Sequence, residues 1–251
     1  MKKKSGQARI FLLVSLLLNC VLLVALFVGE RSGHAYRAAL VRRGIVAYDD
    51  AKTAGYWTKM GWTNTLQKMN LTCDAVFFGS SSTRGSDFQQ TFPDLSIVNL
   101  GLAGDNLLGM LYRIDMVMAV HPKKVFIMAG TNDLFHSSIE QFSDRYETLL
   151  ASLRDSLPLA EVYLESLLPI NHELKPQAPS HDQLSRANEA IRQIAKKHGC
   201  TFIDLYEHYV QEGELPKDLT RDGIHLKPEA YGIWAETIKN YLYESSYSAS
   251  N

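Results

Sequence analysis

Residues 75–83 read AVFFGSSST and residues 124–133 read KVFIMAGTND. In both stretches an apolar run ends at a glycine, and small polar residues follow. Short continuous apolar runs are typical of strands that are buried on both faces of a parallel sheet. Three further runs have this character. The five predicted strands cover residues 75–78, 96–99, 124–129, 161–166 and 201–205.

Amphipathic segments separate these strands. Ser138-x-x-Gln141 and Ser180-x-x-Gln183 have the spacing of capping boxes, so we expect a helix to begin after each serine. Gly199 suits the end of the second helix, and Pro228 suits the first turn of a last helix. The residues expected to point inward from that last helix are Ile233, Trp234, Ile238 and Leu242. This alternation predicts an α/β fold, a three-layer α/β/α sandwich with a five-stranded parallel sheet.

Four polar segments are predicted to meet at the carboxyl edge of this sheet, where parallel sheets bind ligands. They are Gly79-Ser80-Ser81-Ser82-Thr83, Gly101-Leu102-Ala103-Gly104-Asp105-Asn106, Gly130-Thr131-Asn132-Asp133 and Thr220-Arg221-Asp222-Gly223-Ile224-His225. The first three follow strands, and the fourth precedes the last helix. They therefore hold the candidates for the chemistry of this chain.

Acyl transfer from an ester needs a nucleophile, a base and donors for the oxyanion. Ser81 lies on a predicted strand-to-helix turn, which exposes a hydroxyl. Asp222 precedes His225 by three residues on one loop, so its carboxylate can orient the imidazole. Gly104 and Asn132 are candidates for a backbone N–H and a side-chain amide that stabilise the oxyanion.

These blocks, in this order, resemble the SGNH (GDSL-type) hydrolase family from about residue 74 to 243. The resemblance implies a flavodoxin-like arrangement, a Ser81–His225–Asp222 triad, and an oxyanion hole of Ser81, Gly104 and Asn132. It also implies ester hydrolysis with no metal or organic cofactor. Family substrates include acetylated sugars, lysophospholipids, short-chain esters and thioesters. Ser80 departs from the family pattern, because the first family block has an aspartate there.

Three other functions compete with ester hydrolysis. An acyltransferase would use the same triad with a carbohydrate or lipid hydroxyl as acceptor. A flavodoxin-like protein would bind phosphate or a nucleotide at the serine-rich loop, which leaves Asn132, Asp222 and His225 without a role. A catalytically silent carbohydrate- or phosphate-binding module is suggested by Ser80, but the intact triad residues argue against it.

The N-terminal part of the chain predicts a membrane anchor. Residues 10–28, IFLLVSLLLNCVLLVALFV, carry no charge and are long enough to cross a bilayer core of about 30 Å. A cleaved signal peptide is the alternative, although its apolar region is normally shorter. We expect residues 1–9 to be a basic cytoplasmic leader and residues 29–71 a stalk or lead-in. The hydrolase domain would then occupy residues 72–244 outside the cytoplasm, followed by a tail at 245–251.

The net charge of the chain limits the kinds of partner that it can be expected to bind. The net charge of −1 gives no basic surface for nucleic acid, so we expect a small-molecule, glycan or lipid ester as substrate and the membrane as the other partner.

Cys73 and Cys200 are expected to be buried thiols, although a disulfide between them is an alternative. No cysteine spacing indicates a metal. The six histidines interpreted as structural are His121, His136, His172, His181, His198 and His208. The sequence carries no signal for an oligomeric state.

Overall fold

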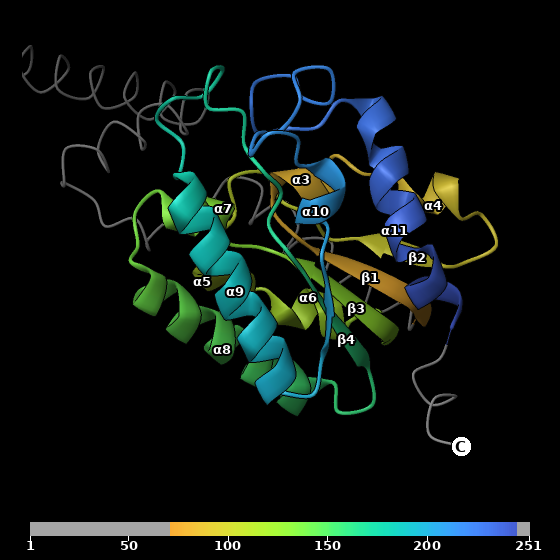
Figure 1. Cartoon of the computed structure of the whole chain (residues 1–251). Coiled ribbons are helices and arrows are strands. Elements are labelled where there is room, and N and C mark those ends of the chain that lie inside the picture. The colour runs from red at the N-terminus through yellow and green to blue at the C-terminus, as the bar shows by residue number, and fades with distance from the viewer. Residues whose placement is uncertain (1–70, 245–251) are drawn as a thin grey trace, which may run out of the picture. The chain divides into compact units, whose positions relative to one another are not determined.

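The computed structural model describes residues 71–244 (Figure 1). The predicted leader, the predicted membrane span, nearly all of the lead-in and the tail lie outside the described residues. Within residues 71–244, no helix has both the length and the apolar character that crossing a bilayer requires. The anchor therefore stays a prediction from the sequence.

The sheet has five strands in the order β2-β1-β3-β4-β5, and all neighbouring pairs are parallel. The strands are β1 (Cys73–Gly79), β2 (Ile97–Asn99), β3 (Pro122–Met128), β4 (Glu161–Glu165) and β5 (Thr201–Ile203). All five predicted strands are present, and each end lies within two residues of the predicted one. The prediction for β5 ran two residues too far, because Leu205 already has helical backbone angles at the start of the next helix.

Helices cover both faces of this sheet (Figure 1). The short helices are α3 (Ser81–Arg84), α4 (Phe88–Thr91), α5 (Leu107–Leu111), α6 (Ile114–Met118), α7 (Thr131–Leu134), α10 (Tyr206–Tyr209) and the 3-10 turn η2 (Pro228–Ala230). The long helices are α8 (Ile139–Ser156), α9 (His181–Lys197) and α11 (Tyr231–Tyr243). The predicted sandwich is therefore present in the described residues.

The two faces hold separate apolar cores, because side chains alternate across a strand. Phe78 and Ile127 lie in the core that includes the buried side chains of α8 and α9. Phe77 and Phe126 lie in the core that includes Trp234 of α11. On this second face the rings of Phe77, Phe126 and Tyr163 stack across three paired strands, with centroids 4.8 and 4.6 Å apart.

The local helix signals are confirmed with one exception. Both capping boxes form, at Ser138 and at Ser180, and Gly199 has a φ of 62° directly after His198, the C-cap residue of α9. Pro228 begins the η2 turn rather than α11 itself. Ile233 is half-buried instead of fully inward, whereas Trp234 and the other two predicted residues of that face are buried.

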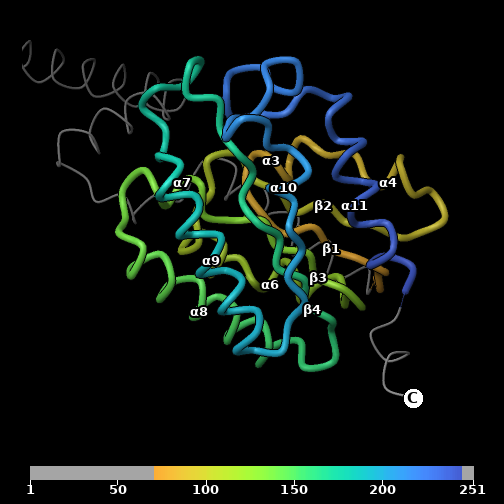
Figure 2. Tube along the Cα trace, in the orientation of Figure 1, coloured from red at the N-terminus to blue at the C-terminus, as the bar shows by residue number. Residues whose placement is uncertain are grey.

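The strand order positions the site. The chain runs from β1 outward to β2 and then returns to the other side of β1 to form β3 (Figure 2). The connections after β1 and β3 therefore leave the sheet at a switch point, where open parallel sheets leave a crevice for ligands. Ser81 follows β1 and Asn132 follows β3, so both lie at this point.

Candidate active site

Ser81 is the first residue of α3 and lies two residues after Gly79, which occupies a position where only glycine fits. A Cβ on Gly79 would lie 2.1 Å from Thr83 Oγ1 and 2.4 Å from the carbonyl oxygen of Met128. A real Cβ does not approach other atoms that closely, so the tight return of the chain from β1 into α3 requires glycine at this position. Ser80 is buried at the turn, whereas the half-buried Ser81 directs its Oγ toward His225.

The three predicted triad residues lie in hydrogen-bonding contact. Ser81 Oγ is 3.0 Å from Nε2 of His225, and Nδ1 of the same imidazole is 2.7 Å from Oδ2 of Asp222. Ser81 and His225 are 144 positions apart in sequence, so the fold brings them together. This is the geometry in which an imidazole removes a proton from a hydroxyl while a carboxylate sets its tautomer.

The loop that carries Asp222 and His225 is held by hydrogen bonds between its side chains and its own backbone. Oδ1 of Asp222 accepts the N–H groups of Ile224 at 3.1 Å and of His225 at 2.9 Å. The hydroxyl of Thr220 donates to the carbonyl of His225 at 2.9 Å, and Gly223 turns the chain with a φ of 94°. The imidazole is therefore oriented before any substrate binds.

The electrostatics of Asp222 follow from these contacts. Burial opposes its ionisation, but the N–H groups of His225 and Ile224 and the imidazole of His225 outweigh that effect and lower the pKa of Asp222 to about 2. Asp222 is thus a carboxylate at neutral and mildly acidic pH, and it can stabilise a positive charge on His225.

The two predicted oxyanion residues lie on the neighbouring loops. Gly104 is exposed, has a φ of 74°, and leaves open space where a side chain would stand. The amide Nδ2 of Asn132 donates to the carbonyl of Asp105 at 2.7 Å. One hydrogen bond therefore connects the loop after β3 to the loop that carries Gly104. Asp105 does not cap a helix, because the cap of α5 is the side chain of Asn106.

Arg113 supports these loops and was not singled out from the sequence. Its buried guanidinium donates to Oδ2 of Asp105 at 2.7 Å, to the carbonyl of Leu100 at 2.7 Å and to the carbonyl of Gly79 at 2.9 Å. It therefore connects the end of β1, the segment after β2 and the loop of Gly104. The available signal was an arginine between the largely apolar segments of α5 and α6, in which Asp115 is the other charged residue.

Asp133 makes a further connection. Its Oδ2 accepts the N–H of Leu107 at 3.1 Å, which joins α7 to the start of α5. Burial raises the pKa of Asp133 to about 7, although the bond from Leu107 and the charge of Arg145 act in the opposite direction. The side chain of Asp133 therefore packs the start of α7 against the start of α5.

Comparison with known proteins shows the family to which the chain belongs. A sequence model of the GDSL-like Lipase/Acylhydrolase family matches residues 52–233, which is most of the chain. The chain belongs to this family. Membership supports ester hydrolysis as the general reaction of this GDSL-like protein. The match begins within the stretch that sequence analysis assigned to the lead-in.

Relatives of this GDSL-like protein extend over most of its length. Platelet-activating factor acetylhydrolase IB subunit alpha1 of Pongo abelii is 23% identical over 201 residues, which cover 77% of this chain and 85% of that protein. A solved structure from Streptococcus pneumonia, described provisionally as a platelet activating factor, has a TM-score of 0.66 and 26% identity and covers 73% of this chain and 92% of the other. A GDSL-like lipase from Bacteroides thetaiotaomicron VPI-5482 has a TM-score of 0.63 at 22% identity, covering 73% and 96% respectively.

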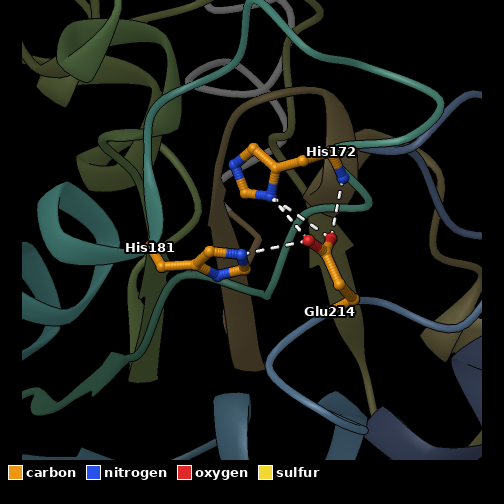
Figure 3. Close-up of side chains that lie close together, drawn as sticks. All are labelled: His172, His181 and Glu214. Carbon is orange, nitrogen blue, oxygen red and sulfur yellow. Dashed lines mark hydrogen bonds and ion pairs between the residues drawn. The ribbon is translucent and has the colours of Figure 1, made fainter.

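Two other groups of reactive side chains lie outside the triad of this GDSL-like protein. Cys73 and Cys200 are free; Cys73 is buried, which raises its pKa to about 12, and Cys200 is half-buried. His172, His181 and Glu214 converge in one cluster (Figure 3). From the sequence both histidines were expected to be structural, and the structure brings Glu214 to them.

Proposed function

We propose that this chain hydrolyses carboxylic esters, with Ser81 as nucleophile, His225 as general base and acid, and Asp222 as the group that orients His225. The observation that carries the proposal is the continuous hydrogen-bonded line from Ser81 Oγ through the imidazole to Asp222, with distances of 3.0 and 2.7 Å. A phosphate-binding loop has no need for a histidine at that position. Family membership supports the same reaction class.

The reaction follows from these contacts. Ser81 Oγ attacks the ester carbonyl carbon while Nε2 of His225 takes the hydroxyl proton. The tetrahedral intermediate collapses as the C–O bond to the alcohol breaks, and His225 gives its proton to the leaving oxygen. Water then attacks the acyl-enzyme and passes a proton to His225. Ser81 recovers the proton when the carboxylic acid leaves.

The oxyanion of the intermediate needs fixed donors. We assign this role to the backbone N–H groups of Ser81 and Gly104 and to the amide of Asn132. Support comes from the hydrogen bond between Asn132 and Asp105, which holds the amide against the loop of Gly104. Preformed donors of this kind stabilise the transition state without reorganisation during the reaction.

The acyl group in this proposal is short, and acetyl is the first choice. One relative is named an acetylhydrolase, which agrees with a short acyl group. The alcohol part would belong to an envelope glycan, a lipid or a small ester.

The place of the reaction is also a proposal. The uncharged run at residues 10–28 would anchor the chain as a single membrane span, with the hydrolase domain outside the cytoplasm. Ester groups on envelope glycans and lipids would lie within reach of a domain held there.

The test is hydrolysis of p-nitrophenyl esters, from acetate to decanoate, by the full-length chain. We expect Ser81→Ala to lower kcat/KM by about 10³-fold or more, since it removes the nucleophile. The matched control is Ser82→Ala, which deletes the neighbouring hydroxyl and should stay within a few fold of wild type. We expect acetate and other short esters to react fastest.

Two results would overturn the proposal. If Ser82→Ala loses activity and Ser81→Ala retains it, the nucleophile is wrong. If the folded wild-type chain is no faster than Ser81→Ala, simple hydrolysis is excluded, and acyl transfer to a carbohydrate or lipid hydroxyl becomes the leading function.

A further inference from the structure

His172, His181 and Glu214 come from three segments that are separate in sequence. His172 lies in the loop after β4, His181 is the first residue of α9, and Glu214 closes a small turn with Gln211. Figure 3 shows both imidazoles directed at the carboxylate of Glu214. Nδ1 of His172 is 3.2 Å from both carboxylate oxygens, and Nε2 of His181 is 3.0 Å from Oε1.

The other ring nitrogen of His172 fixes which atom faces the cluster. Nε2 of His172 lies 2.9 Å from the carbonyl oxygen of Pro179. A carbonyl only accepts hydrogen bonds, so Nε2 carries the proton, and Nδ1 of a neutral ring then holds a lone pair. Metal-binding histidines are normally oriented in this way, by donating the second N–H to a carbonyl or carboxylate.

Glu214 is held equally firmly. Its Oε2 accepts the backbone N–H of His172 at 2.7 Å, so the carboxylate has a fixed position against the imidazole. Lone pairs on Nδ1 of His172 and on the carboxylate would face each other, which is unfavourable unless a cation lies between them.

We propose that His172, His181 and Glu214 bind a divalent transition-metal ion of the Zn²⁺ type. Two imidazoles and one carboxylate are a common donor set for such ions. In a tetrahedral site with bonds of about 2.1 Å, neighbouring donor atoms are about 3.4 Å apart. The distances of 3.0 and 3.2 Å are close to that value, and all three donor atoms lie within 4.8 Å of one another.

The exposure of the cluster leaves room for the rest of the coordination sphere. The side chains of His172, His181 and Glu214 are 20, 48 and 34% exposed. An ion can therefore enter from solvent and complete its coordination with water. Within residues 71–244, the cluster brings three such side chains together, each with a ligand atom within 4.8 Å of the others.

A bound ion would join the loop after β4 to the candidate active site. Asn171, next to His172, donates its backbone N–H to the carbonyl of Gly223 at 2.8 Å, within the loop of Asp222 and His225. The side chain of Asn171 also donates to the carbonyl of Leu215, next to Glu214. We therefore assign the ion a structural role, closing three segments that support this loop. The proposal does not depend on the reaction at Ser81.

The experiment uses the full-length chain, purified through a tag without histidine, stripped with EDTA and desalted. Titration calorimetry with ZnCl₂ should show one ion bound per chain. At a free concentration of about 100 times Kd, the Tm should rise by about 5–10 °C. With Co²⁺ as a second probe, we expect the visible d–d bands of a low-coordinate nitrogen and oxygen site.

His181→Ala removes an exposed ligand with little risk to folding, and it should weaken Zn²⁺ binding by at least about tenfold and abolish the Co²⁺ bands. Glu214→Gln keeps the size of the side chain but removes its charge, and should have the same effect. The matched control is the exposed His208→Ala, which should bind Zn²⁺ like wild type.

The proposal is overturned if wild type binds Zn²⁺ no more tightly than His181→Ala, since protons alone then occupy the cluster. It is equally overturned if His208→Ala weakens binding as much as His181→Ala does.

Discussion

Asp222 shows how one side chain serves both local structure and proposed chemistry. One carboxylate oxygen accepts two backbone N–H groups of its own loop, and the other faces Nδ1 of His225. The same contacts lower the pKa of Asp222 to about 2. Lowering the pH from 8 to 4 therefore leaves this carboxylate ionised, so Asp222 does not cause any loss of activity in that range.

Asp222→Asn tests the orienting role. The amide oxygen can still accept the backbone N–H groups, so we expect an unchanged circular dichroism spectrum and Tm within a few degrees. The NH₂ group would face Nδ1 of His225 and favour the wrong tautomer, so kcat should fall by about 10⁴-fold. Steady-state kinetics on p-nitrophenyl acetate measures the effect. A folded Asp222→Asn chain with kcat close to wild type would contradict the assignment.

Arg113 acts at the scale of elements, because it connects three chain segments at the carboxyl edge of the sheet. Its guanidinium is fully buried, donates to Asp105 and to two carbonyls, and packs 4.4 Å from the ring centroid of Phe78. A planar group with several N–H donors can satisfy these acceptors together, whereas the single ammonium of lysine cannot. The position of the Gly104 loop therefore depends on an arginine.

Arg113→Met should destabilise the fold by about 3–5 kcal/mol, since it leaves the buried Asp105 without its counter-charge. Arg113→Lys should recover only part of this loss. The control is Arg186→Met on α9, where the arginine is 56% exposed and its ion pairs measure 3.8 Å. That change should cost less than about 1 kcal/mol. Urea denaturation measures all three variants, and equal losses for Arg113→Met and Arg186→Met would contradict the role of Arg113.

At the scale of the whole molecule, buried carboxyl groups make stability depend on pH. Glu165 at the end of β4 is fully buried, and it accepts the indole N–H of Trp234 in α11 at 2.7 Å. Burial raises the pKa of Glu165 to about 8, although the bond from Trp234 acts in the opposite direction. Asp133, with a pKa of about 7, is a second group of this kind.

The sign of the effect follows from proton binding. An unfolded glutamate has a pKa of about 4.3, so between pH 4.3 and 8 the unfolded chain has lost a proton that folded Glu165 still holds. The free energy of unfolding should therefore fall as pH rises through this window. Glu165→Gln keeps an acceptor for Trp234 but does not titrate. We expect this substitution to make the fall in the free energy of unfolding between pH 5 and 8 smaller by up to a few kcal/mol. Asp133 accounts for part of the fall that remains.

Urea denaturation at pH 5 and pH 8 measures how the free energy of unfolding depends on pH in wild type and in Glu165→Gln. The control is Glu236→Gln on the outer face of α11, where the side chain is 79% exposed, and its pH dependence should match wild type. An undiminished pH dependence in Glu165→Gln would show that this carboxyl does not hold its proton in the folded chain.

Local sequence patterns were sufficient to predict the strands, the main helix starts and the short-range contacts of this protein. Short apolar runs predicted the strands, and serine–glutamine spacing predicted the starts of α8 and α9. Asp222 and His225 lie three residues apart on one loop, so their contact was predictable as well. These features depend on interactions within a few residues, and local patterns record such interactions directly.

Only the tertiary structure decided which distant residues meet. The order β2-β1-β3 put the serine turn and Asn132 at one switch point, and it directed Ser81 rather than its neighbours toward His225. Arg113 reaches Gly79 across 34 positions, and His181 reaches Glu214 across 33. Such contacts form because packing both faces of the sheet brings the loops together. A side chain's own neighbours in sequence do not encode that packing.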